Sequence, residues 1–463
     1  MDSSAIVFCY ALYLFDGRKR LGNPGRITGC HALGEVNNTS LEKHPTMNRR
    51  RFLKQATKTA ASTVAAVVAG PEVVPTWASG GGPAARMSHT RSGESLPIRD
   101  ISVQLVQSDC GRKWTHVRVH TKEGLTGIGE ATYSRKETVV ARMVEALKPH
   151  ILGRDAFDIE GIYRDLYSGG GTAYRTGGII FTSAISGIDQ ALWDLKGKAL
   201  GAPVCTLLGG PRSSRVPVYS HFGGPDKDAL VANAHSVLSE GFRALKSSIS
   251  ISEARGPRIS REELRNIDSR YAALRQSLGE EILLMDDPHA AFDPTSALEV
   301  ARLLEPYRLL FFEEPTIPED PEGYARVRQG TTTPIAGSER LTNKHRFNDF
   351  FRAAALDVAQ PDPVYIGGIT EMRKVCSLAE THQVSIAPHN TKGPVGTMAA
   401  AHVMAAIPNP LILEWIAPSR IPWRNDVLKD PLVLQDGSLV VPDRPGLGVE
   451  FDEDALEPHL VSY

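Results

Sequence analysis

The stretch Ile282-Leu283-Leu284-Met285-Asp286-Asp287 is a short apolar run that ends in acidic residues. The next such run, Leu309-Leu310-Phe311-Phe312, ends in Glu313, 26 positions after Asp287. Six polar residues end runs of this kind, at steps of 26, 26, 23, 27 and 25 residues: Asp287, Glu313, Glu339, Asp362, His389 and Glu414. A buried strand, a loop and a helix together need about this many residues. The repeat therefore predicts an α/β fold in which consecutive βα units over residues 216–420 close a parallel, TIM-like barrel.

The carboxyl ends of parallel barrel strands meet at one mouth, so the six polar stops should share a single site. Asp287, Glu313 and Glu339 are consecutive carboxylates, which would repel one another at a buried mouth without a cation. Oxygen-only ligands favour a hard ion such as Mg²⁺. Each carboxylate alone is also suited to cap the helix that follows it. Three at nearly equal spacing favour a metal site, with Asp287 preferred to Asp286 because it keeps the regular step.

The remaining stops predict acid–base chemistry. Asp362 next to His389 would orient the imidazole and raise its basicity, which suits a general base. If the segment after Asp287 is extended, His289 faces the same side and is placed as a general acid. Lys246 ends the run at 241–245 and could bind a substrate carboxylate. Glu414 could donate a hydrogen bond to an enediolate oxygen if its pKa is raised, and it could equally form a structural ion pair.

Residues 98–215 show a different rhythm. Period-two apolar spacing at 101–105 and 116–120 predicts strands, and helical periodicity follows at 137–150 and 183–199. Strands followed by helices indicate an α+β unit, here a capping domain.

The N-terminal region reads as a targeting segment. Asn48-Arg49-Arg50-Arg51-Phe52-Leu53-Lys54 precedes a short, Ala-rich apolar stretch at 60–70, which is typical of a twin-arginine signal peptide over 47–80. An ordinary amphipathic helix is the alternative. We expect translation to begin at Met47, with 1–46 a disordered or absent leader, 81–97 a linker, and the enzyme exported to the periplasm rather than cytoplasmic.

Composition narrows the class of protein. The formal net charge of −1 and 23% charged residues indicate neither a nucleic-acid partner nor a polyanionic tail. No apolar run reaches the roughly 18 residues of a membrane span. The five scattered cysteines lack a C-x-x-C pair and suggest neither a disulfide framework nor a zinc site.

Longer motifs make the chain resemble the enolase superfamily, specifically its mandelate racemase/muconate lactonizing enzyme branch. The resemblance covers about residues 98–455. It rests on the stretch from Ala184 to Lys198, Leu207-Leu208-Gly209-Gly210, Glu313-Glu314-Pro315, Gly367-Gly368-Ile369-Thr370 and Pro445-Gly446-Leu447-Gly448. It implies a (β/α)7β-type barrel whose α+β cap also receives the C-terminal segment 421–463. Relatives are often dimers or octamers, so the resemblance also implies a homo-oligomer.

The same resemblance matches Asp287, Glu313 and Glu339 to the family's Mg²⁺ ligands, Asp362 and His389 to its dyad, and Glu414 to the carboxyl that contacts the intermediate. Asp287-Pro288-His289 looks like the galactonate dehydratase type of acid-sugar dehydratase. In these enzymes the dyad His removes the C2 proton of an aldonate and the other His protonates the departing C3 hydroxyl, giving a 2-keto-3-deoxy acid.

Two departures from the family pattern bear on the reaction and its substrate. Many relatives carry Lys-x-Lys where this chain has Lys246-Ser247-Ser248, which disfavours racemisation and Lys-dependent cycloisomerisation. The Gly-Arg that follows Asp-x-His in several dehydratases is absent, which leaves the substrate open. An epimerase or cycloisomerase of an (anhydro-)sugar acid, and an exported sugar-acid-binding protein without turnover, are the alternatives.

Overall fold

The computed structural model describes residues 95–108, 111–169, 177–254 and 256–463. The predicted leader 1–46 and signal peptide 47–80, and most of the linker 81–97, lie outside the described residues. Within the described part, no helix combines the length and the apolar character that crossing a bilayer requires.

The capping domain is built on an antiparallel sheet in the order β14-β1-β2-β3. Its strands are β1 (Ile98–Gln107), β2 (Lys113–Thr121), β3 (Thr126–Glu130) and β14 (Leu460–Val461). The helices of this part are α3 (Glu137–Leu147), α4 (Ile159–Ser168), α5 (Gly178–Leu200) and α6 (Val204–Leu207). The predicted strands and helices of the cap are thus observed, and the last strand comes from the C-terminal end of the described chain.

Helix α5 lies very close to strand β3, and three glycines permit this approach. A Cβ atom on Gly129 would stand 1.9 Å from the carbonyl oxygen of Gly187, and one on Gly127 would stand 2.0 Å from that of Ala191. Both distances are shorter than any van der Waals contact, so only glycine fits. The long helix is thereby fixed against the sheet that faces the barrel.

The second domain is a parallel barrel, which confirms the predicted fold class. Its strands, in order, are β4 (Arg215–His221), β5 (Ala244–Ser247), β6 (Leu283–Asp286), β7 (Phe311–Glu313), β8 (Ile335–Gly337), β9 (Val358–Ala359), β10 (Ser385–Ile386) and β11 (Leu413–Glu414). Neighbouring strands pair in parallel from β4 to β10, and β11 pairs in parallel with β4. A parallel bridge between Ile386 and Pro410 closes the ring.

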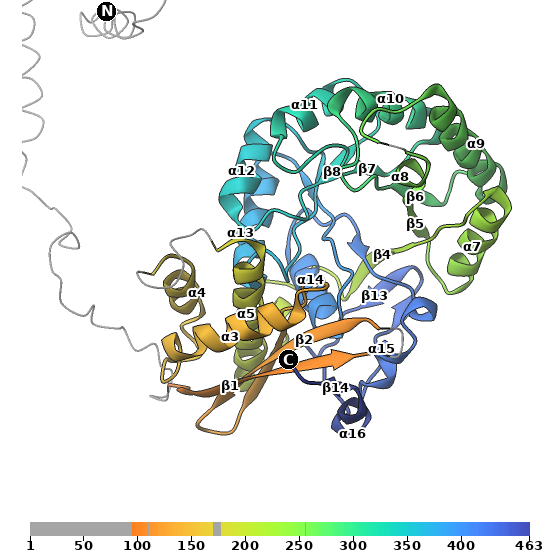
Figure 1. The fold of residues 1–463 in the computed structure, drawn as a ribbon. Coiled ribbons are helices and arrows are strands. Elements are labelled where there is room, and N and C mark those ends of the chain that lie inside the picture. The colour runs from red at the N-terminus through yellow and green to blue at the C-terminus, as the bar shows by residue number, and fades with distance from the viewer. Residues whose placement is uncertain (1–94, 109–110, 170–176, 255) are drawn as a thin grey trace, which may run out of the picture. The chain divides into compact units, whose positions relative to one another are not determined.

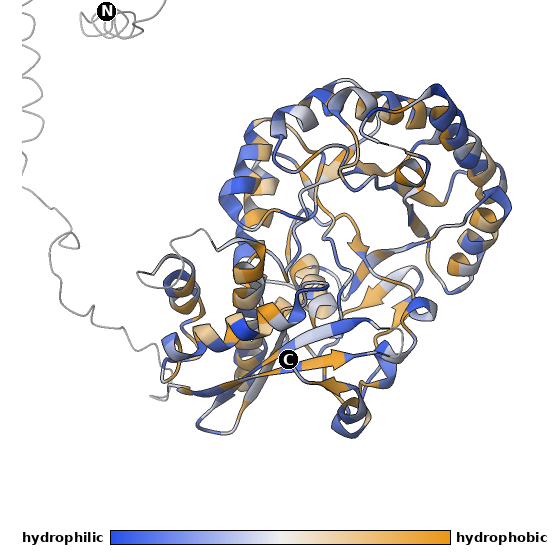
Figure 2. Ribbon diagram, viewed as in Figure 1, coloured by the Kyte–Doolittle hydropathy of each residue, from blue (hydrophilic) through white to orange (hydrophobic). Residues whose placement is uncertain are grey.

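Helices connect these strands and cover the outside of the barrel. They are α7 (Lys227–Ser239), α8 (Ile249–Glu253), α9 (Arg261–Leu278), α10 (Pro294–Leu304), α11 (Pro321–Gln329), α12 (Lys344–Arg352), α13 (Gly368–Thr381) and α14 (Pro394–Ala406). Helices α7 and α9 to α12 form an arc around strands β4 to β8, and the short helix α8 lies on the inner side of this arc (Figure 1). In Figure 2 the helices of this arc carry both hydrophilic and hydrophobic residues, as helices with one buried face do.

The C-terminal segment contacts both domains. After η3 (Pro418–Arg420) and α15 (Trp423–Asp426), strands β12 (Leu434–Gln435) and β13 (Ser438–Val440) form a hairpin. Strand β13 pairs antiparallel with β4 of the barrel. The chain then passes through α16 (Glu453–Leu456) and η4 (Glu457–His459) to β14, which pairs with β1 of the cap.

Candidate active site

The interior of the barrel contains an apolar layer to which every strand region contributes one residue. Its members are Tyr219, Ala244, Met285, Phe311, Ala336, Val358, Ala387 and Ile412. In extended chain the residue two positions later points the same way, one step closer to the mouth. Those positions hold His221, Lys246, Asp287, Glu313, Ser338, Gln360, His389 and Glu414. The mouth is therefore lined by a polar layer directly above an apolar one.

Lys246 lies at the centre of this polar layer. Its Nζ is 2.8 Å from both carboxylate oxygens of Glu313, 3.0 Å from Oε1 of Glu414 and 3.4 Å from Oδ2 of Asp287. Burial would lower the pKa of Lys246, but the charges of Glu313 and Glu414 overcome it and raise the pKa well above its usual value. Lys246 is consequently a fixed cation and not a base.

The neighbouring Asp286 and Asp287 face different ways, and only one of them lies in the mouth. Asp286 is completely buried, and its Oδ1 accepts hydrogen bonds from Oγ of Ser247 at 3.0 Å and from the backbone N–H of Ile249 at 2.9 Å. Asp287 instead contacts Lys246 and His289. Asp286 thus holds the loop after β5, and Asp287 lies in the mouth, where the regular spacing places it.

Asp362 and His389 form a hydrogen-bonded pair. Nδ1 of His389 lies 2.7 Å from Oδ2 of Asp362, and since a carboxylate only accepts, Nδ1 carries the proton and Nε2 faces the mouth. Nζ of Lys392 lies 3.0 Å from the same Oδ2 atom. Burial would lower the pKa of His389, but the charge of Glu339 and the bond to Asp362 raise it. The free Nε2 has the basicity and direction that a proton acceptor needs.

Glu339 follows β8 and approaches the mouth from a loop. Its Oε2 lies 3.5 Å from Nε2 of His389. Burial and the charge of Asp287 raise the pKa of Glu313 well above its usual value, despite the contact with Lys246. Asp287, Glu313 and Glu339 therefore belong to one crowded group of carboxylates.

His289 reaches Asp287 by a route that differs from the sequence prediction. The segment is not extended, because His289 and Ala290 have φ values of 51° and 60° and form a turn. The prediction that the segment after Asp287 is extended is therefore wrong. The turn still brings Nε2 of His289 to 3.3 Å from Oδ2 of Asp287, and the side chain is 48% exposed. His289 thus lies at the solvent-facing edge of the site.

Of the two roles predicted for Glu414, the structure shows the ion pair, with Nζ of Lys246 3.0 Å from its Oε1. Burial would raise its pKa, but the charges of Lys246 and His221 hold the pKa of Glu414 well below its usual range. The condition that its pKa be raised is not met, so Glu414 accepts hydrogen bonds and does not donate one. Its Oε2 accepts from the backbone N–H of Asn390 at 2.7 Å, next to His389.

Sequence reasoning missed three side chains of the site. His221 ends β4, and its Nε2 pairs with Oε1 of Glu414. Nε2 of Gln360 donates to Oε2 of Glu313 at 2.7 Å. Lys392 is 2% exposed and contacts Asp362. Counting two positions on from the innermost apolar residue of each strand would have found His221 and Gln360.

The cap reaches the same site through Glu130 at the end of β3. Its Oε1 accepts from the backbone N–H of Gly393 and its Oε2 from that of Gly396, both at 2.8 Å. Both glycines follow His389: Gly393 ends the loop before α14, and Gly396 lies in the first turn of that helix. Glu130 consequently ties the position of this loop to the capping sheet.

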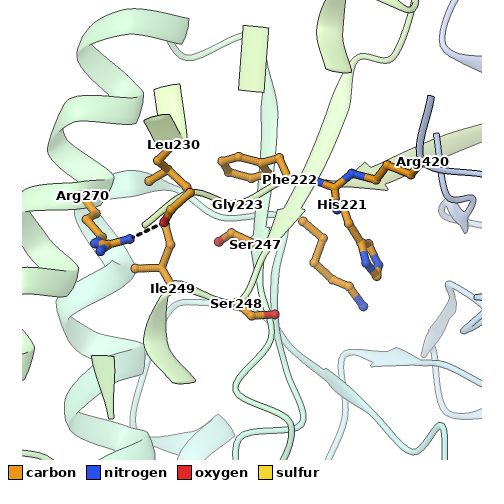
Figure 3. A pocket seen from close by; sticks show the side chains of 11 residues that line it. His221, Phe222, Gly223, Leu230, Ser247, Ser248, Ile249, Arg270 and Arg420 are labelled. Atoms are coloured by element: carbon orange, nitrogen blue, oxygen red, sulfur yellow. Dashed lines mark hydrogen bonds between the residues drawn. The ribbon is translucent and has the colours of Figure 1, made fainter. Parts of the chain in front are cut away.

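A pocket of about 300 Å³ opens beside the mouth. His221 and Lys246 form part of its wall, and Ser248, Arg270 and Arg420 line it further out (Figure 3). Because ionised Glu414 only accepts, Nε2 of His221 carries the proton, which leaves Nδ1 as an acceptor. Since Arg270 and Arg420 line its outer part, the pocket joins the polar layer of the mouth to a region that carries more positive charge.

Comparison with known proteins gives the family. Residues 95–209 match the N-terminal domain of mandelate racemase / muconate lactonizing enzymes, and residues 229–455 match the enolase C-terminal domain-like family. The chain belongs to the mandelate racemase/muconate lactonizing enzyme family of the enolase superfamily. The resemblance seen in its motifs is thereby confirmed.

Relatives within this family share most of the chain. A D-galactonate dehydratase from Xanthomonas oryzae pv. oryzae is 34% identical over 359 residues, which cover 74% of this chain and 90% of that protein. A D-xylonate dehydratase from Haloferax volcanii is 34% identical over 379 residues, covering 79% and 90%. The crystal structure of a mandelate racemase/muconate lactonizing enzyme-like protein from Rubrobacter xylanophilus has a TM-score of 0.74 at 31% identity, covering 80% and 98%. The protein is an enzyme, and its curated relatives are hydro-lyases.

Members of the enolase superfamily generally use a divalent metal, so the donor set needs a test. In the described part of the chain, no three His, Cys, Asp or Glu side chains already converge on one metal position. The donors are nevertheless the oxygens that a hard cation prefers. Burial, and after it the charge of Asp287, raises the pKa of Glu313, so a further positive charge beside these carboxylates would favour their ionised form. The residues therefore fit a divalent cation by their chemistry.

Proposed function

We propose that this enzyme is a Mg²⁺-dependent dehydratase of a sugar acid. It removes the C2 proton and eliminates the C3 hydroxyl, which gives a 2-keto-3-deoxy acid after the enol tautomerises. The observation that carries the proposal is the joint presence, at one mouth, of an Asp-supported imidazole, a buried ammonium and a group of carboxylates. The similarity to D-galactonate and D-xylonate dehydratases supports the same reaction type.

In this proposal His389 takes the C2 proton at Nε2, while Asp362 fixes the ring through Nδ1. His289, at the solvent-facing edge, delivers a proton to the departing hydroxyl. Lys246 contributes positive charge for the substrate carboxylate, and the ionised Glu414 keeps Lys246 and His221 in place. In this scheme the removal of the C2 proton and the protonation of the departing hydroxyl are each assigned to one imidazole, His389 and His289.

Asp287, Glu313 and Glu339 would hold the Mg²⁺. When bound, the ion supplies Lewis-acid stabilisation of the negative charge that develops on the substrate carboxylate as the proton leaves. Without such stabilisation, the proton next to a carboxylate is far too weakly acidic for a base that titrates near neutrality. The metal and Lys246 together are thus expected to supply most of the rate enhancement.

The test is product analysis on a panel of sugar acids with Mg²⁺ in D₂O, followed by NMR. Formation of a 2-keto-3-deoxy acid supports dehydration. Deuterium incorporation at C2 with inverted configuration, an intact carbon skeleton and no loss of water would instead indicate an epimerase. Ring formation would indicate a cycloisomerase. Metal binding without exchange or turnover on any acid would indicate a binding protein.

We also propose that the enzyme is exported as a folded protein through the twin-arginine route. The argument is the Arg49-Arg50-Arg51 motif and the Ala-rich stretch after it. Replacing Arg49, Arg50 and Arg51 by lysine should retain the protein in the cytoplasmic fraction. Unchanged export of this variant would refute the proposal.

We further propose a homo-oligomer, as is common among relatives. Light scattering coupled to size-exclusion chromatography measures the mass directly. A single species with the mass of one chain would refute it.

A further inference from the structure

The pocket beside the mouth is lined by cations and by no acidic residue of the described chain. Its cations are Lys246, Arg270 and Arg420. The mouth itself, by contrast, is rich in carboxylates. A substrate that spans both regions therefore meets opposite electrostatic environments at its two ends.

Two of these cations are neutralised within the protein. Lys246 is held by Glu313 and Glu414, as described above. Arg270 forms an ion pair with Glu253 at 2.9 Å and donates to the carbonyl oxygen of Gly224 at 3.0 Å, the bond drawn in Figure 3. Arg270 therefore adds no unpaired charge to the pocket, and Lys246 is the cation already assigned to the first carboxylate of the substrate.

Arg420 is different. It is exposed, lines the pocket next to His221, and donates to the neutral side-chain oxygen of Asn233 at 3.0 Å. Within the described residues it has no carboxylate within ion-pair distance. Glu240, which is bonded to Ser419, attracts Arg420 without forming an ion pair with it, so the guanidinium still presents positive charge to the pocket.

Arg424, one turn further along, strengthens this field. Its side chain is 1% exposed, Nη2 donates to the carbonyl oxygen of Ile416 at 2.9 Å, and the guanidinium lies 4.8 Å from the ring centre of Trp415. Nε and Nη1 have no hydrogen-bond partner among the described residues. A buried guanidinium with unused donors costs free energy that a nearby anion would recover.

Arg112 adds a third positive charge from the cap. It lies in the connection between β1 and β2 and is exposed. Burial lowers the pKa of Arg424 to about 9, and the charge of Arg112 contributes to the lowering. Burial also lowers the pKa of Arg420, and Arg112 again contributes. The three arginines thus lie within electrostatic reach of one another.

We infer that Arg420, backed by the buried charge of Arg424, binds a second anionic group at the far end of the substrate. The substrate class is then a dianionic polyhydroxy acid, either an aldarate or an aldonate with a terminal phosphate. A guanidinium pairs with both kinds of anion through two parallel hydrogen bonds. A volume of about 300 Å³ is at the lower end for ligand pockets and suits an acid of about six carbons. The inference rests on the proposed dehydration and narrows its substrate.

The experiment compares kcat/KM for six-carbon acids of matched stereochemistry: the aldonate, the aldarate and the aldonate phosphorylated at its last carbon. The wild-type enzyme should prefer one dianion over the aldonate by about tenfold or more. Arg420→Gln should lower kcat/KM for that dianion by about tenfold and change the aldonate less than about twofold. If the aldarate has the higher kcat/KM, the second anion is a carboxylate. If the phosphorylated aldonate does, it is a phosphate.

Arg308→Gln is the matched control, because Arg308 is an exposed arginine before β7, at the end of the barrel opposite the mouth. This variant should leave kcat/KM for the dianion and kcat/KM for the aldonate unchanged. A wild-type preference for the aldonate, or an equal loss on all acids in Arg420→Gln, would overturn the second anion site while leaving the dehydratase intact. If no acid is dehydrated, the proposed function fails, and calorimetric binding of the aldarate tests the site alone. Weaker binding to Arg420→Gln then supports it, and equal binding overturns it.

Discussion

Nζ of Lys246 lies 2.8 Å from both carboxylate oxygens of Glu313, with both side chains buried. Glu414 and Asp287 complete the surroundings of the ammonium at 3.0 and 3.4 Å. One cation thus faces three carboxylates, so the stability of this part of the fold depends on the charge of Lys246.

Lys246→Met should destabilise the metal-free enzyme. Removing one partner of a buried ion pair leaves unpaired charge and costs about 3–5 kcal/mol in the free energy of unfolding. Mg²⁺ should recover part of this loss, since it would bring positive charge back to the same carboxylates. Urea unfolding with EDTA and with Mg²⁺ measures both effects.

A useful comparison is Lys429→Met, which removes a fully exposed ion pair with Glu450. Its urea midpoint should stay close to that of the wild type under both conditions. If Lys246→Met were as stable as this control in EDTA, the compensation described above would be wrong.

His389→Asn should remove the base and keep the fold. The amide of Asn can still donate to Asp362, but it cannot accept the C2 proton, so turnover should fall by about 10²- to 10⁴-fold. Deuterium exchange at C2, followed by NMR, should stop together with product formation. His235→Asn, on the outer helix α7, serves as the control with normal turnover. Substantial exchange in His389→Asn would exclude it as the base.

Glu130→Gln should slow catalysis from the cap. The new NH₂ group would face the backbone N–H of Gly393 or Gly396, and a buried donor without an acceptor costs about 1–3 kcal/mol. Because these glycines follow His389, we expect kcat to fall more than KM changes. Steady-state kinetics tests this, with Glu123→Gln in the exposed turn of the same sheet as the control. An unchanged kcat would show that the loop does not depend on the cap.

Acid should destabilise the fold through His402. The backbone N–H of Cys205 donates to its Nδ1, and its Nε2 lies 3.1 Å from the carbonyl oxygen of Leu447, so the buried ring is neutral. Burial lowers the pKa of His402 to about 4, below the usual 6.5. The unfolded chain therefore binds the proton first as the pH falls. Stability is complete above about pH 6.5 and decreases toward pH 4, by about 3 kcal/mol for this group.

The control for this pH effect is a residue that does not titrate. Gln at position 402 can accept and donate as the neutral imidazole does, so His402→Gln should lose less stability between pH 6.5 and pH 4 than the wild type. Urea unfolding at several pH values measures the difference. Equal slopes in the two proteins would contradict the assignment.

The barrel was predictable because its strands repeat one physical pattern. Each strand buries a short apolar run, and the polar residue at its end marks the mouth, as Asp287, Glu313 and Glu414 illustrate. Glu339, Asp362 and His389 follow their strands by two or three residues and lie in loops. Their approach to one another depends on loop conformation, which spacing alone does not determine.

Other features of the site depend on contacts between distant segments. The turn that carries His289 requires positive φ at two non-glycine residues, which the sequence does not indicate. The low pKa of Glu414 arises from Lys246 and His221, which lie 168 and 193 positions earlier in the chain. Glu130 acts across the boundary between cap and barrel. Such effects become visible only when the three-dimensional arrangement is known.

The pairing of β14 with β1 has a consequence for biosynthesis. The first strand of the cap emerges from the ribosome more than three hundred residues before Leu460 and Val461, which cover its edge. During that interval the backbone groups of Val106 and Leu105 lack their native neighbour and could pair with another nascent chain. Completion of the polypeptide, rather than completion of the barrel, is therefore the event that closes this edge.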